Sequence, residues 1–155
     1  MIIRQATAAD IEALFTLNMQ IGNLHFANAP EAFALPSEAD KALLMNALKD
    51  ESYLFLVAEI DKNVVGYITA TITQNETISF LVHCRICRIG TIVVDEHCRS
   101  QGIGQYLMQA CRNWAKEQGA EQIRLEVMAF NESAQQFYTQ LGFVNQSHIM
   151  CQLLD

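Results

Sequence analysis

The chain has 155 residues, of which 10 are lysine or arginine and 17 are aspartate or glutamate, so its formal net charge is −7. This length predicts one domain, residues 1–155, that is large enough to bury an apolar core. The acidic balance and the absence of a basic stripe argue against a nucleic-acid partner, and no apolar run reaches the length of a membrane span. Five cysteines, an odd number, and a start without a signal-peptide pattern predict reduced thiols in a cytoplasmic protein.

The first half of the chain reads as apolar strands around two helices. Thr7 and Ser37 are the expected caps of these helices. Between the helices, residues 24–36 hold both prolines and break the helical pattern. The polar residues 61–63 are typical of a turn that joins two strands into a hairpin. In chain order the expected elements are a strand at 2–5, a helix from 8 toward 22, a helix at 39–49, and strands at 53–59 and 64–73.

The second half alternates strand and helix. Gly90 interrupts a long apolar run and is expected to mark a β-bulge or a close backbone approach. Gly119 and Gly142 are the expected ends of the two helices in this half. The expected elements are a strand at 78–94, a helix at 103–118, a strand at 122–128, a helix at 131–141 and a strand at 143–153. The order predicts an α/β layered fold with a mostly antiparallel first half and a parallel or splayed pair in the middle.

Residues 92–104 read IVVDEHCRSQGIG, an apolar strand and a polar turn that lead into a helix. Gly102 and Gly104 remove side chains where a backbone could approach a ligand, and a helix N-terminus with Arg99 beside it favours an anion such as a pyrophosphate. A P-loop is excluded because neither glycine is followed by Lys-Ser or Lys-Thr. A dinucleotide fingerprint is disfavoured because Leu107 stands where that fingerprint has a small residue. The pyrophosphate of coenzyme A and a turn without a ligand are the alternatives that stay open.

A second motif follows at residues 131–143, with the pattern N-x-x-A-x-x-F-Y-x-x-L-G-F. Together with the R-x-x-G-x-G turn and the opening I-R-x-A-x-x-x-D of residues 3–10, it resembles the GNAT superfamily of acyl-CoA-dependent N-acetyltransferases. The resemblance is strongest from Ile89 to Phe143. It implies an α/β fold with a mixed, mostly antiparallel central sheet, a splayed pair of its fourth and fifth strands, and helices on both faces.

The same resemblance implies acetyl-CoA as the acyl donor. The backbone at the end of the fourth strand would pair with the pantetheine arm as an added strand does, the turn would wrap the pyrophosphate, and Asn131 would hydrogen-bond the arm. An ordinary helix cap is the alternative role of Asn131. The residues implied in cofactor binding are Ile92, Val93, Val94, Arg99, Ser100, Gln101, Gly102, Ile103, Gly104 and Asn131.

Two residues are the expected proton carriers. Tyr138 stands where the family places an acid beside the coenzyme sulfur, although a tyrosine that only packs in the core is the alternative. Glu126 is the expected base, because a carboxylate in an apolar strand is costly unless it is partnered or used, and an ion pair with Arg124 or another neighbour is its alternative. The spacing of Glu126, Asn131 and Tyr138 resembles that of the ribosomal-protein alanine N-acetyltransferases, but the chain carries Met128 where that branch tends to have a basic residue.

The acceptor is expected to be a small-molecule or peptide amine, attacked directly in a ternary complex with an oxyanion donor near Val94. Residues from the segment between the first two helices would line its pocket: His25, Phe26, Glu31 and Phe33. The family also implies pairing of two copies through C-terminal strands. A non-catalytic acyl-CoA-binding or sensing module of the same fold is the alternative function.

No metal is expected, although His83, Cys84 and Cys87 are close in sequence. On an extended strand, Cys84 and Cys87 are an odd number of residues apart and so face opposite sides. Cys111 and Cys151 are expected in the core.

Overall fold

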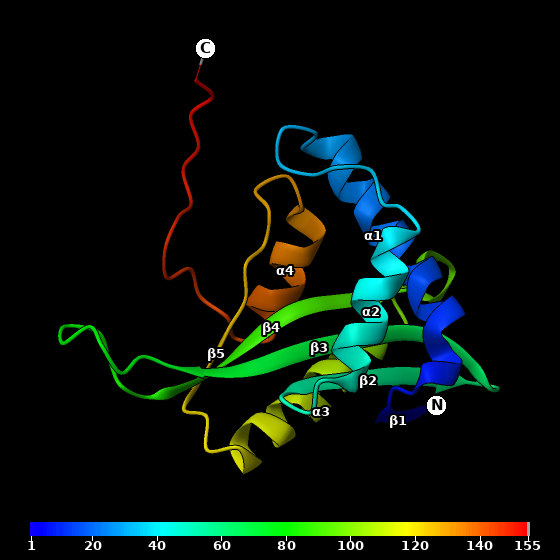
Figure 1. The fold of residues 1–155 in the computed structure, drawn as a ribbon, viewed down its shortest axis with the longest axis horizontal. Coiled ribbons are helices and arrows are strands. Elements are labelled where there is room, and N and C mark those ends of the chain that lie inside the picture. The colour runs from blue at the N-terminus through cyan, green and yellow to red at the C-terminus, as the bar shows by residue number, and fades with distance from the viewer. Residues whose placement is uncertain (155) are drawn as a thin grey trace.

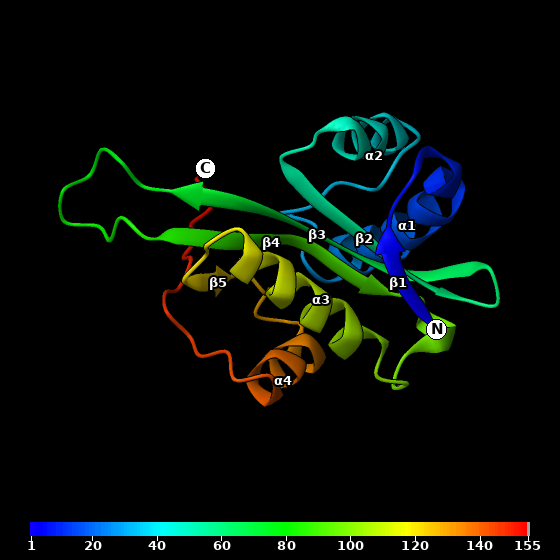
Figure 2. The ribbon, with the colours of Figure 1, turned by 90° about the horizontal axis from the view of Figure 1, so that it is seen from below.

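A computed structural model describes residues 1–154 of the chain. Five strands form one sheet in the order β1-β2-β3-β4-β5, antiparallel throughout except for the parallel β4–β5 pair. Helices α1 and α2 cover one face of this sheet, and α3 covers the other, with α4 beside α3 on that side (Figures 1 and 2). The α/β layered architecture, with its mixed sheet and helices on both faces, is as the sequence predicts. The elements are β1 (Ile2–Gln5), α1 (Ile11–Asn28), α2 (Ala39–Lys49), β2 (Tyr53–Ile60), β3 (Asn63–Gln74), β4 (Arg85–Val94), α3 (Ile103–Glu117), β5 (Gln122–Arg124) and α4 (Glu132–Gln140), with short 3-10 turns at Ala8–Asp10 and Glu96–Cys98.

Helix α1 is longer than the sequence predicts. It was expected to end near Gly22 but continues to Asn28, because that glycine has a packing role. A Cβ atom at position 22 would overlap the ring of Pro36, which lies against this point of the helix. The loop between α1 and α2 therefore folds back onto α1. His25 and Phe26 are helical rather than part of the loop.

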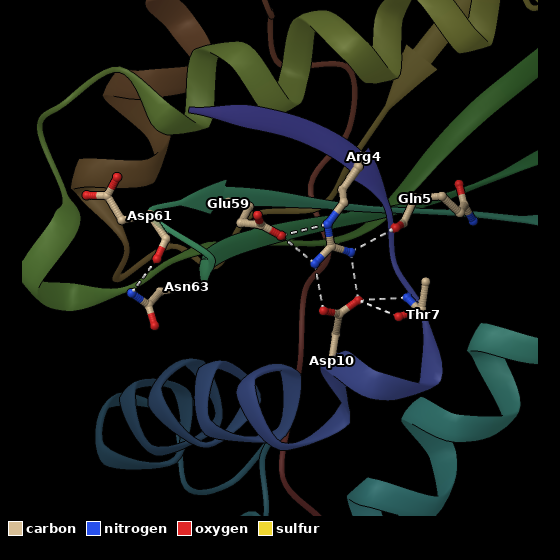
Figure 3. Close-up of polar contacts among 7 residues, drawn as sticks. All are labelled: Arg4, Gln5, Thr7, Asp10, Glu59, Asp61 and Asn63. Atoms are coloured by element: carbon tan, nitrogen blue, oxygen red, sulfur yellow. Dashed lines mark hydrogen bonds and ion pairs between the residues drawn. The ribbon is translucent and has the colours of Figure 1, made fainter.

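The start of the chain is held by a partly buried ion cluster (Figure 3). The guanidinium of Arg4 donates two hydrogen bonds to the two carboxylate oxygens of Asp10, at 2.9 and 2.8 Å, and a third to Glu59 at 2.8 Å. Asp10 also accepts a bond from the backbone N–H of Thr7, which confirms Thr7 as the cap that begins this turn. The Arg4 hydrogen bonds hold the pKa of Asp10 at about 2. The expected cap of the second helix, Ser37, lies one residue before the observed cap, because α2 begins after Glu38.

A bulge bends β4, as the glycine in its sequence suggests. The register between β3 and β4 shifts at Thr69 and Ala70, where Gly90 is the extra residue. The N–H of Thr91 donates to Oγ1 of Thr69 at 3.0 Å, and a Cβ atom on Gly90 would lie 3.0 Å from the same oxygen. Bulges of this kind bend the strand that carries them.

Three expected strand segments are not strands. Residues 78–84 form the connection between β3 and β4, which projects beyond the helices (Figure 1). Residues 125–128 continue past β5 without pairing, and residues 143–153 lack strand structure. A strand needs a neighbouring strand for its N–H and C=O groups, and within residues 1–154 none lies beside these segments.

The apolar core has two parts, one on each face of the sheet. The part under α3 includes Cys87 of β4 and Cys111 of α3, whose sulfur atoms are 3.9 Å apart. Cys111 is thus a core residue, as expected. Cys151 is exposed, so its expected place in the core was wrong, because the strand that would have carried it does not form.

Candidate active site

Strand β4 has a free edge where the sheet splits. It pairs with β5 only from Ile86 to Arg88, opposite Gln122–Arg124. Beyond that point, among residues 1–154, the edge of β4 that faces β5 has no strand beside it. Residues 92–94 therefore present to the gap a strand edge that no other strand of the described chain pairs with. Such an edge can accept an extended amide chain as an added strand.

The free edge leads directly into the turn before α3. Gly102 begins this helix with φ +78°, a left-handed conformation that favours glycine. The side chain of Arg99 folds back so that its Nε donates to the carbonyl of Val94 at 3.3 Å. The first N–H groups of any helix lack partners within the helix and carry positive potential. The end of β4, a guanidinium and a helix N-terminus are thus brought together, and such an arrangement favours an anion.

Gly104 has a reason to be glycine that the sequence alone did not reveal. A Cβ atom at this position would lie 3.1 Å from the ring of Phe137. The missing side chain therefore lets α4 pack closely against the start of α3. A contact between the Gly104 N–H and a phosphate stays a prediction.

Gln20 of α1 fixes the start of the turn, and sequence reasoning missed it. Its Nε2 donates to a carboxylate oxygen of Asp95 at 2.9 Å, and its Oε1 accepts from the N–H of Glu96 at 3.1 Å. The hydrogen bond from Gln20 is the main reason that the pKa of Asp95 lies below its usual value. No local pattern could have revealed a contact between residues 75 apart in the chain.

Tyr138 of α4 lies half-buried on the α3 side of the sheet. Its ring packs against Phe137 at 5.3 Å and Phe143 at 5.7 Å between ring centroids. Burial raises the pKa of the Tyr138 hydroxyl to about 12, because a phenolate would be poorly solvated there. The hydroxyl therefore stays protonated at neutral pH, the state that a proton donor needs.

Glu126 is exposed, two residues beyond the end of β5. Ile123 and Leu125 pack into the core under α3, so alternation directs Arg124 and Glu126 to the other face. Glu126 and Arg124 do not form the ion pair that was the alternative to a catalytic role, because Arg124 donates to Gln122 instead. No hydrogen bond in the described chain joins Glu126 to Tyr138.

Asn131 and Gln135 shape the loop between β5 and α4. Oδ1 of Asn131 accepts from the N–H of Ala134 at 3.1 Å, so this residue caps α4. Gln135, which the sequence did not single out, donates to the carbonyls of Met128 and Ala129 at 3.2 and 3.0 Å. The loop is thereby held against the first turn of the helix.

His25 of α1 contacts both the loop between α1 and α2 and the loop between β5 and α4. Its Nδ1 lies 2.7 Å from the carbonyl of Ile21, and its ring packs against Phe33 at 4.6 Å and Phe130 at 5.6 Å. The structure thus brings together two of the four residues expected at the acceptor, His25 and Phe33, and adds Phe130 as a neighbour that only the fold reveals. Within residues 1–154, Phe26 makes no ring contact with this cluster and Glu31 makes no hydrogen bond or ion pair.

Two further expectations concern metals and membranes. Across residues 1–154, no three histidine, cysteine, aspartate or glutamate side chains are grouped so that they could hold a metal ion. None of the helices in this range combines the length and the apolar character that crossing a membrane requires.

Comparison with known proteins places this geometry in a family. Residues 19–143 match the model of the acetyltransferase (GNAT) family. The N-alpha-acetyltransferase of the archaeon Sulfurisphaera tokodaii is 32% identical over 91% of this chain and 78% of its own. A crystal structure of a mutant of the BH1408 protein from Bacillus halodurans has 26% sequence identity and superposes with a TM-score of 0.94 over 99% of both chains.

A more distant structure shares the fold alone. The aminoglycoside N-acetyltransferase AAC(6')-Iy, in complex with a bisubstrate analogue of coenzyme A and an acetylated neamine, has a TM-score of 0.77 at 18% identity, covering 99% of this chain and 97% of its own. The similar proteins thus include one named N-alpha-acetyltransferase and one named aminoglycoside N-acetyltransferase. The family match and the N-alpha-acetyltransferase relative agree with the free edge of β4 and the turn before α3: this chain belongs to the GNAT family of acetyltransferases.

Proposed function

We propose that the protein transfers an acetyl group from acetyl-CoA to a primary amine by direct attack in a ternary complex. The observation that carries this proposal is the free edge of β4 at residues 92–94, which runs without interruption into the Arg99–Gly104 turn at the N-terminus of α3. An extended amide chain that ends in a pyrophosphate matches both parts at once. Coenzyme A has that composition.

In this proposal the chain binds the donor through main-chain groups. The backbone of Ile92, Val93 and Val94 pairs with the pantetheine amides. The N–H groups of Ser100–Gly104, with the guanidinium of Arg99, hold the pyrophosphate, and the side-chain amide of Asn131 reaches the arm while its oxygen caps α4.

The proposed chemistry removes two protons from the acceptor nitrogen and delivers one to the coenzyme sulfur. Glu126, directly or through water, takes a proton from the ammonium, because an alkylamine is protonated at neutral pH. The amine nitrogen then attacks the thioester carbonyl, the C–N bond forms, and an N–H near Val94 stabilises the oxyanion. As the C–S bond breaks, the attacking nitrogen gives its second proton to solvent, so that a neutral amide forms. Tyr138 gives its proton to the departing thiolate, and solvent returns a proton to Tyr138.

Binding of the donor is tested at Gly102. We expect Gly102→Ala to weaken coenzyme A binding about tenfold in calorimetry, because the new Cβ opposes the left-handed backbone and shifts the N–H groups of the turn. Gly119→Ala is the matched control, since it removes a glycine of φ +72° from the other end of α3. Equal affinity in both variants and the parent would contradict the pyrophosphate assignment.

Turnover is tested by release of free thiol from acetyl-CoA with a panel of amines. We expect Glu126→Gln to lower kcat by about 10²-fold or more, the usual contribution of a general base, with coenzyme A affinity unchanged. Glu121→Gln, an exposed residue just before β5, is the control and should leave kcat as it was. Binding of acetyl-CoA with no thiol release for any amine would favour the alternative, a non-catalytic acyl-CoA-binding module.

We also propose that the chain is a single domain that works in the cytoplasm as a homodimer, so that its partner is a second copy of the chain. The support is the segment 144–154, which is extended and leaves Ile149 78%, Met150 92% and Leu154 87% exposed. Sedimentation velocity tests it: Ile149→Glu should shift a dimer toward the monomer, while Gln109→Glu, the same charge change on the exposed face of α3, should not. A monomeric parent protein would overturn the proposal.

A further inference from the structure

Two arginines face each other on the last paired rung before β4 and β5 separate. Arg88 and Arg124 are direct partners in the parallel register. Their neighbours Cys87 and Ile123 point into the core under α3, so the two arginine side chains leave the sheet on the opposite face. Helices α1 and α2 cover the other end of that face and leave this end open (Figures 1 and 2). We name Arg88 and Arg124 the arginine pair.

The arginine pair lacks the anionic partners that such a pair needs. Arg88 donates to the hydroxyl of Thr73 at 3.1 Å, and Arg124 donates twice to the side-chain oxygen of Gln122. Both acceptors are neutral, and no carboxylate of residues 1–154 lies within 4.0 Å of either guanidinium. Like charges directly opposite each other destabilise a sheet. In contrast, Arg4 bonds to two carboxylates.

A cavity of about 240 Å³ lies at the arginine pair. Thr73 and Ile86 form part of its floor on the sheet, and Leu81 and Val82 of the β3–β4 connection form an apolar wall. A small cavity that has an apolar wall and two arginines in its lining is suited to orienting a small anionic ligand. The two guanidinium forks match the planar geometry of a carboxylate.

The cavity adjoins the place assigned to the reaction. Glu126 follows Arg124 by two residues, a step of about 7 Å along an extended chain, and alternation directs both to the same face. A carboxylate bound to the arginine pair would therefore lie close to an amine held at Glu126, so one small molecule can carry both groups. This separation suits an acceptor whose amino group and carboxylate are close together.

We propose that the arginine pair binds the carboxylate of the acceptor, so that the acceptors are amines carrying a carboxylate near the amino group, such as free amino acids. This inference rests on the proposed function and names its substrate class. The pair positions the acceptor and takes no part in proton transfer. The two positive charges of the arginine pair would also attract the acceptor carboxylate, which the negative net charge of the protein otherwise repels.

The experiment compares amino acids with their own amides, which keep the amine and lose the carboxylate. We expect kcat/KM with acetyl-CoA to be about tenfold or more higher for each acid than for its amide, since a charged hydrogen-bonded pair contributes at least that much. Arg88→Gln and Arg124→Gln should each remove this preference by raising KM for the acids, with kcat/KM for the amides within about threefold of the parent. Equal use of acid and amide by the parent would overturn the inference.

Arg85→Gln is the matched control. Arg85 lies on the same strand, but its guanidinium is next to Gly119 at the end of α3, on the other face of the sheet. Removal of this charge should leave the acid preference intact. A loss of preference equal to that of Arg88→Gln would point to net charge instead of a binding site and would also overturn the inference.

Direct binding separates this inference from the proposed function. Calorimetric titration of an N-acetylated amino acid into the parent should show binding that Arg88→Gln and Arg124→Gln abolish and that Arg85→Gln retains. Carboxylate binding without thiol release would preserve the arginine site and refute the acetyltransfer. Acetylation of amines without carboxylate binding would refute the arginine site alone.

Discussion

Tyr138 shows how one environment fixes the protonation state of a residue. Its ring lies between Phe137 and Phe143, and burial raises the pKa of its hydroxyl to about 12. The group is therefore neutral through the physiological range and acquires no charge until strongly alkaline pH. A proton donor of this kind is matched to a thiolate, which needs a proton only as the C–S bond breaks.

We expect Tyr138→Phe to lower kcat by about 10²-fold or more and to leave coenzyme A affinity nearly unchanged, because only the hydroxyl is lost. Steady-state kinetics and calorimetry measure the two quantities. Since the pKa of Tyr138 is about 12, kcat of the parent should show no alkaline decline from this group below pH 10. Tyr53→Phe, at the exposed start of β2, controls for loss of a tyrosine hydroxyl, and a kcat equal to the parent in Tyr138→Phe would remove this residue from the mechanism.

At the scale of the elements, the sequence predicts what depends on local pattern. The strand at 2–5, the strand expected at 53–59, the helix at 39–49 and the bulge at Gly90 follow from periodicity and turn chemistry and are present, the second strand with one more residue. The length of α1 could not be predicted, because Gly22 reads as a helix end until Pro36 is found packed against it.

In the candidate site, too, the features that depend on local sequence can be predicted, and the contacts between distant segments cannot. The turn at 99–104 and the cap at Asn131 are visible as motifs, because their residues are contiguous or regularly spaced. The contact of Gln20 with Asp95 and the opposition of Arg88 and Arg124 depend on how distant segments meet. Residues 125–128 and 143–153 have strand composition but no strand beside them, which composition alone does not show.

Gly22 offers a test of packing between α1 and its following loop. In an exposed helix interior, Gly→Ala stabilises by about 1 kcal/mol. Here we expect Gly22→Ala to destabilise, because its Cβ would overlap the Pro36 ring. In a Pro36→Ala background, where the ring is absent, the same substitution should be stabilising relative to that background. Urea unfolding of the four proteins measures this cycle, and the same effect in both backgrounds would contradict the contact.

For the whole molecule, the ion cluster of Arg4, Asp10 and Glu59 couples stability to pH. The pKa of Asp10 in the folded protein is about 2, below its ordinary 3.8. The ionised carboxylate therefore contributes stability above pH 4, and this contribution is lost as pH falls toward 2. The difference between the two pKa values corresponds to about 2 kcal/mol.

We expect Asp10→Asn to lower the free energy of unfolding by about 2 kcal/mol at pH 7 and to converge on the parent near pH 2. Thermal or urea unfolding between pH 2 and 7 measures the difference. Asp40→Asn, at the partly exposed start of α2, is the control and should not show the same convergence. A penalty for Asp10→Asn that is independent of pH would mean that the ion cluster contributes little.

The parallel pairing of β4 and β5 extends over three residues only, so β5 is joined to the four antiparallel strands by a short seam. Everything beyond Arg124 is attached to the body mainly through side chains of α4 packed under α3. In heavy water, the amides of residues 125–128 would therefore exchange much faster than those of β2 and β3, whose ladders run along their whole length. A ligand that binds as an added strand between β4 and residues 125–128 would protect the backbone amides on both sides of the split. Slower hydrogen exchange of these amides would therefore detect ligand binding in the absence of turnover.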